Sequence, residues 1–166
     1  TEVSYIYTLS DPDTGRVMYV GKANKPKERY WRHLHNTPKG ETKSSKWLKS
    51  LLDQGKKPVM NIVDECPSDK AIEIEGEWIR VYSALNPGMV NSHNCTLYIL
   101  HPSVIRFLSD NWFAISGQHE HRCDTCKNTM SVDGATFLCL GHKQMYWKCA
   151  ECVKKPYIPD RDDWDD

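Results

Sequence analysis

The sequence has no net charge and no long apolar run. Its 22 Lys and Arg residues balance 22 Asp and Glu residues, which excludes a protein that is basic over its whole surface, such as a histone-like DNA binder. No segment approaches the ~20 consecutive apolar residues of a transmembrane helix, so we expect no membrane partner. The first ten residues lack the basic start and apolar core of a signal peptide. A length of 166 residues suits one domain, or one domain with a small satellite.

Cysteine, in contrast, is abundant and unevenly distributed. The number is odd, and two pairs have C-x-x-C spacing, whereas a disulfide scaffold favours an even number spread over the chain. The pattern therefore predicts a metal site in a reducing compartment, which is the cytoplasm or, in a eukaryote, the nucleus. The seven residues are Cys66, Cys95, Cys123, Cys126, Cys139, Cys149 and Cys152.

The cysteine-rich segment at residues 119–157 holds more candidate ligands than the four that tetrahedral Zn²⁺ needs. We favour the two C-x-x-C knuckles, with a hairpin expected between them over residues 127–140 that turns at Asp133-Gly134. A competing set keeps the first knuckle and takes Cys139 and His142 in place of the second. The favoured ligands are Cys123, Cys126, Cys149 and Cys152.

The first part of the chain alternates short strands with amphipathic helices. Hydrophobic periodicity and turn residues predict strands over residues 3–9, 16–21 and 58–64, and helices over residues 27–36, 43–54 and 68–85. Ser44 or Ser45 is expected to cap the second helix, and Ser68 the third. A strand-like run followed by a helix is expected between residues 97 and 117.

Basic side chains are concentrated in residues 16–57. This segment carries twelve Lys and Arg residues against three acidic ones, a net charge of +9 in a neutral chain. Such a single-sign bias fits a surface that contacts phosphates, because each cationic side chain releases counterions when it binds a polyanion.

The helix predicted at residues 68–85 carries an unusual carboxylate. Glu77 and Arg80 fall on a face that we expect to be solvated. Glu75 instead lies among apolar neighbours, which is costly unless the carboxylate is paired or binds a metal; a border position that reaches water remains the alternative. The apolar stripe of this helix consists of Ile74, Trp78 and Val81.

Five of these features occur together in a recognisable order. Tyr5-Ile6-Tyr7, Tyr19-Val20-Gly21-Lys22, Arg29, Glu75 and Asn91 resemble the signature of the GIY-YIG nuclease superfamily over roughly residues 3–92, with a Tyr in place of the usual first Gly. The resemblance implies an α+β domain, in which helices flank a three-stranded antiparallel sheet. A small zinc-ribbon-like module would follow it.

The resemblance also implies hydrolysis of DNA phosphodiesters with one divalent cation. Glu75 would hold Mg²⁺ or Mn²⁺ through oxygen, and Arg29 would contact the scissile phosphate. The cation would polarise that phosphate and stabilise the leaving oxygen.

Further roles follow from the same resemblance. Tyr7 and Tyr19 would orient or deprotonate the attacking water, and Lys22 would lower the pKa of a tyrosine or bind phosphate. His33 shares a helix face with Arg29 and would relay a proton or contact phosphate. Asn91 completes the signature.

We therefore expect a metal-dependent DNA endonuclease; the alternative is a catalytically inactive protein of the same fold that binds nucleic acid or serves as an adaptor. The sequence leaves the DNA target and the oligomeric state open. The expected divisions are a nuclease domain at residues 1–96, a connection at 97–118, the zinc module at 119–157 and a disordered acidic tail at 158–166.

Overall fold

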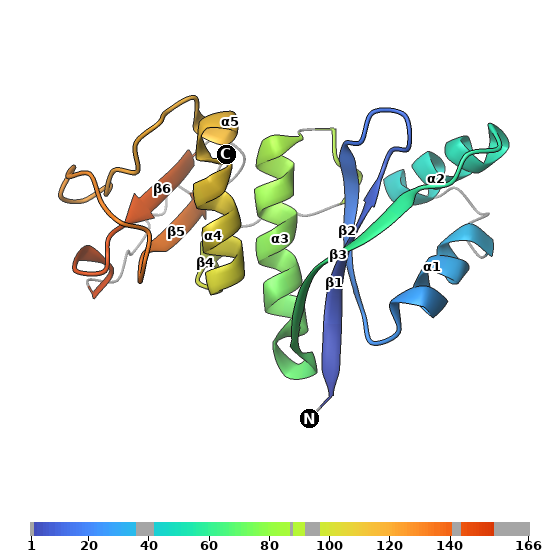
Figure 1. Ribbon diagram of the computed structural model, residues 1–166, viewed down its shortest axis with the longest axis horizontal. Helices are drawn as coiled ribbons and strands as arrows, with labels where there is room; N and C mark the ends of the chain where they lie inside the picture. Colours follow the sequence, from blue (N-terminus) through green and yellow to red (C-terminus); the bar gives the residue numbers. More distant parts are fainter. Residues whose placement is uncertain (1, 36–41, 87, 92–96, 141–143, 155–166) are drawn as a thin grey trace. The chain divides into compact units, whose positions relative to one another are not determined.

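A computed structural model describes residues 2–35, 42–86, 88–91, 97–140 and 144–154. The chain forms two compact units, Thr1–His93 and Asn94–Asp166, which are coloured from blue to green and from yellow to red in Figure 1. None of the helices in the described ranges has the length and apolar character needed to span a bilayer. Each unit is considered by itself.

The first unit is built on a three-stranded antiparallel sheet with the order β2-β1-β3. A tight turn joins the first two strands: the Asp11 carboxylate accepts the backbone N–H groups of Asp13 and Thr14, and Gly15 adopts a φ of +72°. This turn sets the register that pairs Tyr7 with Gly21. The strands are β1 (Val3–Ser10), β2 (Val17–Ala23) and β3 (Val59–Pro67).

Helices cover both faces of this sheet (Figure 1). α1 (Pro26–His35) and α2 (Lys43–Asp53) lie on one side, and α3 (Ala71–Leu85) lies on the other. Under α2 the core contains Tyr7, Leu9 and Leu48, all 2% exposed or less. The predicted fold class, a three-stranded antiparallel sheet flanked by helices, is confirmed.

Two helix starts differ from the sequence prediction. Thr42, rather than Ser44 or Ser45, caps α2, because its hydroxyl accepts the Ser45 N–H at 3.1 Å. Ser68 does not cap α3: it begins a 3-10 helix that precedes α3, and its hydroxyl is 2.8 Å from that of Ser4. The Ser68 side chain therefore contacts β1, although the local sequence had predicted that it caps α3.

The expectation of a solvated face on α3 is wrong. Glu77 and Arg80 are only 6% and 4% exposed, and every residue from Gly76 to Val81 is buried. Apolar periodicity identifies one buried stripe, but burial on this helix extends to the polar positions beside that stripe.

The second unit contains another antiparallel sheet, with the order β4-β5-β6. Its core includes Trp112, Phe137 and Trp147, whose rings meet edge to face. The elements are β4 (Leu97–Ile99), α4 (Pro102–Asp110), α5 (Trp112–Ser116), β5 (Thr136–Leu140), β6 (Gln144–Lys148) and a 3-10 helix (Cys152–Lys154).

The hairpin expected over residues 127–140 is not formed. Gly134 does turn the chain, with a φ of +72°, but it leads into β5, and β5 pairs with β6 instead. The strand partner was misassigned because the Asp133-Gly134 signal marks a turn without fixing which segments pair across it. The acidic tail at 158–166 lies outside the described residues.

Candidate active site and cysteine cluster

Two tyrosines and a histidine form a cluster against the first sheet. Tyr7 lies on β1, Tyr19 on β2 and His33 on α1. The Tyr7 hydroxyl is 2.7 Å from His33 Nε2. The ring centroids of Tyr7 and Tyr19 are 6.2 Å apart, and that of His33 is 5.9 Å from Tyr7 and 5.5 Å from Tyr19. The three predicted residues are therefore in mutual contact.

Gly21 makes this cluster possible. A Cβ atom at this position would lie 2.5 Å from the Tyr7 hydroxyl oxygen and 2.9 Å from the Tyr19 ring, closer than any side chain tolerates. Sequence analysis placed Gly21 in the motif without a role. The strand register could have indicated this role, because pairing the two strands through the Asp11–Gly15 turn puts Gly21 opposite Tyr7.

A polar cavity of about 600 Å³ opens beside the cluster. It brings together Tyr19 and Lys22 from β2, Arg29 from α1 and Glu75 from α3. Four of the predicted residues, separated by as many as 56 positions in the sequence, thus line one hollow. Its other lining residues are Ala23, Asn24, Lys25, Glu28 and Arg32.

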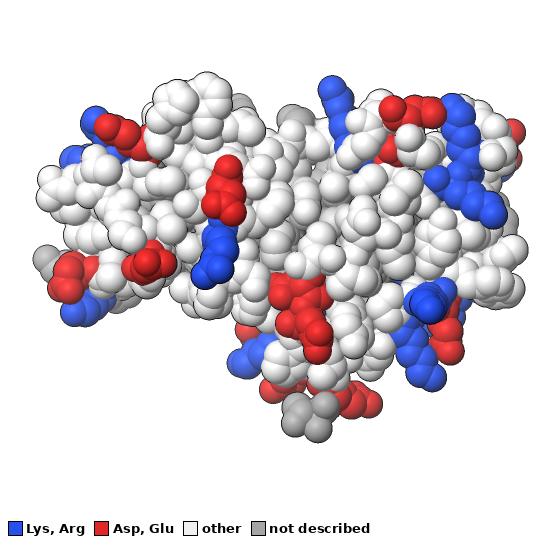
Figure 2. Space-filling view, in the orientation of Figure 1, with Lys and Arg blue, Asp and Glu red and all other residues white. Residues whose placement is uncertain are grey.

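Cationic side chains surround the single carboxylate that α3 contributes to this cavity. Burial raises the pKa of Glu75, while the nearby charges of Lys22 and Arg29 oppose the rise. On the face of the molecule in Figure 2, Lys and Arg side chains lie over α1 and α2. The site therefore combines a partly desolvated carboxylate with the positive potential that a phosphate group requires.

The Tyr7–His33 pair is uncharged at neutral pH. Burial and the neighbouring Arg29 lower the pKa of His33 to about 4. Burial and the neighbouring Tyr19 raise the pKa of Tyr7, although Arg29 opposes the rise. A neutral imidazole with its proton on Nδ1 accepts the phenol proton at Nε2, so the pair is a donor and an acceptor already in contact.

Arg29 connects this pair to the cavity. Burial lowers its pKa, but hydrogen bonding and charge interaction with Tyr7 and Tyr19 outweigh burial and raise it. The guanidinium therefore stays charged while it contacts both phenols and faces Glu75.

Asn91 lies apart from the cavity and binds β2 instead. Its side-chain oxygen accepts the Val20 N–H at 2.8 Å, and its side-chain N–H₂ donates to the Val20 carbonyl at 2.9 Å. Both ends of the amide are engaged with the backbone, which fixes the strand position between Tyr19 and Gly21.

Four cysteines converge in the second unit. Their Sγ atoms all lie within 4.8 Å of one another. The backbone pairs Cys123 with Trp147 in a parallel bridge, which brings the first knuckle beside the end of β6, where the second begins. The cluster consists of Cys123, Cys126, Cys149 and Cys152.

The local backbone favours a thiolate at Cys123, whereas hydrogen bonding with Cys149 and Cys123 raises the pKa of Cys152 to about 12. The Cys149 N–H donates to Cys123 Sγ, and the Cys152 N–H donates to Cys149 Sγ, both at 3.5 Å. Burial raises the pKa of Cys123, but backbone N–H groups outweigh it and lower the pKa to about 6. Four convergent sulfurs with N–H donors could bind zinc. The Cys139 side chain and His142, from the competing set, lie outside the described residues.

Comparison with known proteins identifies the first unit. Residues 3–87 match the family model of the GIY-YIG catalytic domain, a region that covers just over half of the chain and leaves Asn91 outside. No curated protein and no solved structure matches the chain. The matched region contains the two tyrosines, Lys22, Arg29, His33 and Glu75. The chain therefore belongs to the GIY-YIG family of nucleases.

Proposed function

We propose that the protein is a metal-dependent DNA endonuclease whose active site is the cavity lined by Tyr19, Lys22, Arg29 and Glu75. The observation that carries the proposal is the convergence of half-buried Glu75 with Lys22, Arg29 and Tyr19 on one hollow of about 600 Å³. The presence of all four side chains, together with Tyr7, argues against a protein that has kept the fold and lost cleavage.

Glu75 is the residue that would hold a divalent cation such as Mg²⁺ or Mn²⁺. A single carboxylate suits Mg²⁺, which keeps several waters and takes other ligands from substrate phosphates. Burial that raises the pKa of Glu75 also makes the carboxylate a better cation ligand than a fully hydrated one. When bound, the cation would polarise the scissile phosphate and stabilise the leaving oxygen.

Arg29 and Lys22 would bind and orient the scissile phosphate. Arg29 can offer a planar pair of N–H donors to phosphate oxygens, and its contacts with both tyrosines fix it relative to the attacking side. Lys22 lies across the cavity on β2 and would supply a second positive charge. Both would offset the charge that develops on the phosphate in the transition state.

Tyr19, supported by the Tyr7–His33 pair, would act on the attacking water. Tyr19 lines the cavity and would orient the water. Tyr7 is fully buried and is not among the residues that line the cavity, so Tyr7 and His33 would act through Tyr19, whose ring both contact. A free phenolate at Tyr7 is unfavourable because burial raises its pKa, and a histidinium at His33 is unfavourable because its pKa is lowered. The pair would therefore hold Tyr19 in position for the water rather than take its proton.

The test is strand cleavage of supercoiled plasmid with Mg²⁺ by wild type, Glu75→Gln and Glu73→Gln. Glu73 is an exposed carboxylate on the same helix and serves as the matched control. We expect Glu75→Gln to lower the cleavage rate about a thousandfold, equivalent to roughly 4 kcal/mol, and Glu73→Gln to leave it unchanged. Equal inertness of wild type and Glu75→Gln over duplex, nicked, branched and single-stranded DNA would refute the nuclease function.

We further propose that the cysteine cluster binds one structural Zn²⁺. Tetrahedral Zn²⁺ needs four ligands, and the four sulfurs are within reach of one ion. Elemental analysis of gently purified protein should give one equivalent of zinc per chain, which Cys152→Ser removes and Cys66→Ser retains. Less than about half an equivalent in wild type would count against the site.

A further inference from the structure

A second hollow in the first unit lies beside the active cavity. It encloses about 940 Å³ between the start of α1, the first residues of β1 and the edge strand β3. Lys25 and Glu28 line both this groove and the active cavity. A DNA strand whose phosphate occupies the active cavity would therefore have the groove next to it, across the first turn of α1.

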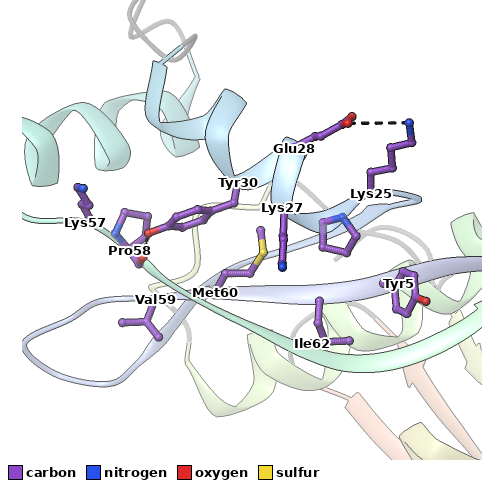
Figure 3. A pocket seen from close by; sticks show the side chains of 11 residues that line it. Tyr5, Lys25, Lys27, Glu28, Tyr30, Lys57, Pro58, Val59, Met60 and Ile62 are labelled. Carbon is purple, nitrogen blue, oxygen red and sulfur yellow. Dashed lines mark hydrogen bonds and ion pairs between the residues drawn. The ribbon is translucent and has the colours of Figure 1, made fainter.

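The floor of the groove is apolar although it faces solvent. Val59 and Ile62, both on β3, are 46% and 49% exposed, and Met60 lies between them along the strand. Tyr5 and Tyr30 add aromatic surface from β1 and α1 (Figure 3). An exposed apolar hollow of this kind on a nuclease domain is costly to maintain unless it receives an apolar or aromatic group.

The floor is also held in place before any ligand arrives. The Tyr30 hydroxyl donates to the Pro58 carbonyl at 2.8 Å, which ties α1 to the start of β3. Burial raises the pKa of Tyr30, so this donor is protonated at neutral pH. A fixed groove loses less conformational entropy on binding than a mobile one.

The rim of the groove is cationic. Lys57 lies at one end and Lys25 at the other, with Lys27 between them (Figure 3). Glu28 is the one acidic residue among those that line the groove, and its carboxylate is 3.8 Å from the Lys25 ammonium group. An apolar floor inside a positive rim complements a nucleotide, whose base is flat and apolar on its faces and whose phosphate is anionic.

We propose that this groove binds an unpaired nucleotide of the DNA strand adjacent to the cleaved bond, with the base against Ile62 and the tyrosines and the phosphates on the lysine rim. The inference deepens the proposed nuclease function and rests on it. Unpaired bases expose the faces that stack on aromatic and apolar side chains, whereas a base in an intact duplex does not. The groove therefore gives the enzyme a preference for DNA with a single-stranded segment beside the cut.

The test compares a blunt DNA duplex with the same duplex carrying a five-nucleotide single-stranded tail. Binding is measured by fluorescence anisotropy without divalent cations, so that no cleavage occurs. Ile62→Ser removes apolar surface from the groove. Ile72→Ser is the matched control, because Ile72 is 75% exposed on α3 and lines neither this groove nor the active cavity.

We expect wild type and Ile72→Ser to bind the tailed duplex about fivefold to tenfold more tightly than the blunt one, and Ile62→Ser to lose that difference while its affinity for the blunt duplex stays within about twofold. Because Ile62 is half exposed, the variant should fold; Val59→Ser repeats the test if it does not.

Three results would overturn the inference. One is equal binding of both duplexes by wild type, and another is an equal loss of affinity for the tail in Ile62→Ser and Ile72→Ser. Alternatively, Ile62→Ser could abolish a concentration-dependent self-association of wild type, which would make the groove an interface between two copies of the chain. These failures leave cleavage by wild type intact, whereas failure of the nuclease function would appear as a wild type that cuts no DNA.

Discussion

The cysteine cluster of the second unit takes its four sulfurs from two short segments, whereas the active cavity of the first unit takes its side chains from β2, α1 and α3. Each C-x-x-C knuckle brings two ligands together through local backbone geometry, and backbone contacts between Cys123 and Trp147 and between Asp124 and Trp147 join the two pairs. The cavity depends on strand register and helix packing throughout the unit. Substitutions far from the cysteine cluster should therefore disturb it less than comparable substitutions disturb the active cavity.

The two sites also differ in their chemistry. Thiolates with backbone N–H donors are the ligands of a closed zinc site that holds structure together. The Glu75 carboxylate, with Lys22 and Arg29 in the same cavity, leaves room for waters and phosphate, which is the arrangement of an open site that performs chemistry. A substitution in the cysteine cluster should therefore change zinc content, whereas a substitution in the active cavity should change cleavage and leave zinc content unaltered.

A large separation of the two sites is expected from Tyr7→Phe. Removing the hydroxyl breaks the 2.7 Å contact with His33 and should lower the cleavage rate about 100-fold, or roughly 2.7 kcal/mol, because small displacements of the residues that position the reacting groups, here Tyr19 and Arg29, cost on that scale. Zinc content should not change. The rate is measured on plasmid DNA at saturating Mg²⁺, with Tyr146→Phe in the second unit as the control; equal rates for Tyr7→Phe and wild type would exclude this positioning role of Tyr7.

A smaller effect should distinguish close packing from backbone conformation. Gly21→Ala places a Cβ against Tyr7 and Tyr19, so we expect a loss of about 2 kcal/mol in unfolding free energy and a strong loss of cleavage. Gly15→Ala meets no atom within 4 Å but occupies a φ of +72°, and it should cost about 1 kcal/mol with cleavage intact. Denaturant unfolding and plasmid cleavage of both variants provide the comparison.

If Gly15→Ala impairs cleavage as much as Gly21→Ala, the turn rather than the contact with the tyrosines controls the site.

A further expected effect is a pH dependence of stability that arises from His33 in the first unit. The pKa of His33 is lowered from 6.5 to about 4 in the fold. Between these values the unfolded chain binds more protons at this position, so the contribution of His33 to stability rises with pH from about 4 to 6.5. The raised pKa of Glu75 opposes this trend. The difference between wild type and His33→Gln isolates the contribution of the histidine.

Denaturant unfolding at several pH values measures that difference. A wild type whose stability changes with pH no more steeply than that of His33→Gln would show that His33 is not desolvated as described.

The different construction of the two sites explains which parts could be predicted. The favoured cysteine set needed only spacing, and its sulfurs converge as expected. The strands and helices of the first unit followed from periodicity and turn residues, and the fold class was confirmed. The role of Gly21 was missed because it depends on register across two strands. The burial of Glu77 and Arg80 was missed because it depends on tertiary packing rather than on the helical period. Local sequence carries neither kind of information.

The sequence also overstated the meaning of some local signals. Ser44 or Ser45 was predicted to cap α2, but Thr42 caps it. Ser68 was predicted to cap α3, but its hydroxyl contacts Ser4 instead. Asn91 was expected at the chemistry and instead binds the backbone of Val20. Its contribution to the site is therefore through the position of β2.

The most direct test of the central claim is an Mg²⁺ titration of cleavage on protein that is already loaded with zinc. The rate of wild type should rise from zero and saturate with Mg²⁺ while the zinc content stays at one equivalent per chain. Glu75→Gln should abolish the response to Mg²⁺ and keep the zinc. Cleavage that proceeds without Mg²⁺, or a Glu75→Gln variant that responds to Mg²⁺ like wild type, would contradict the assignment of an open catalytic cation site at Glu75 distinct from the closed cysteine site.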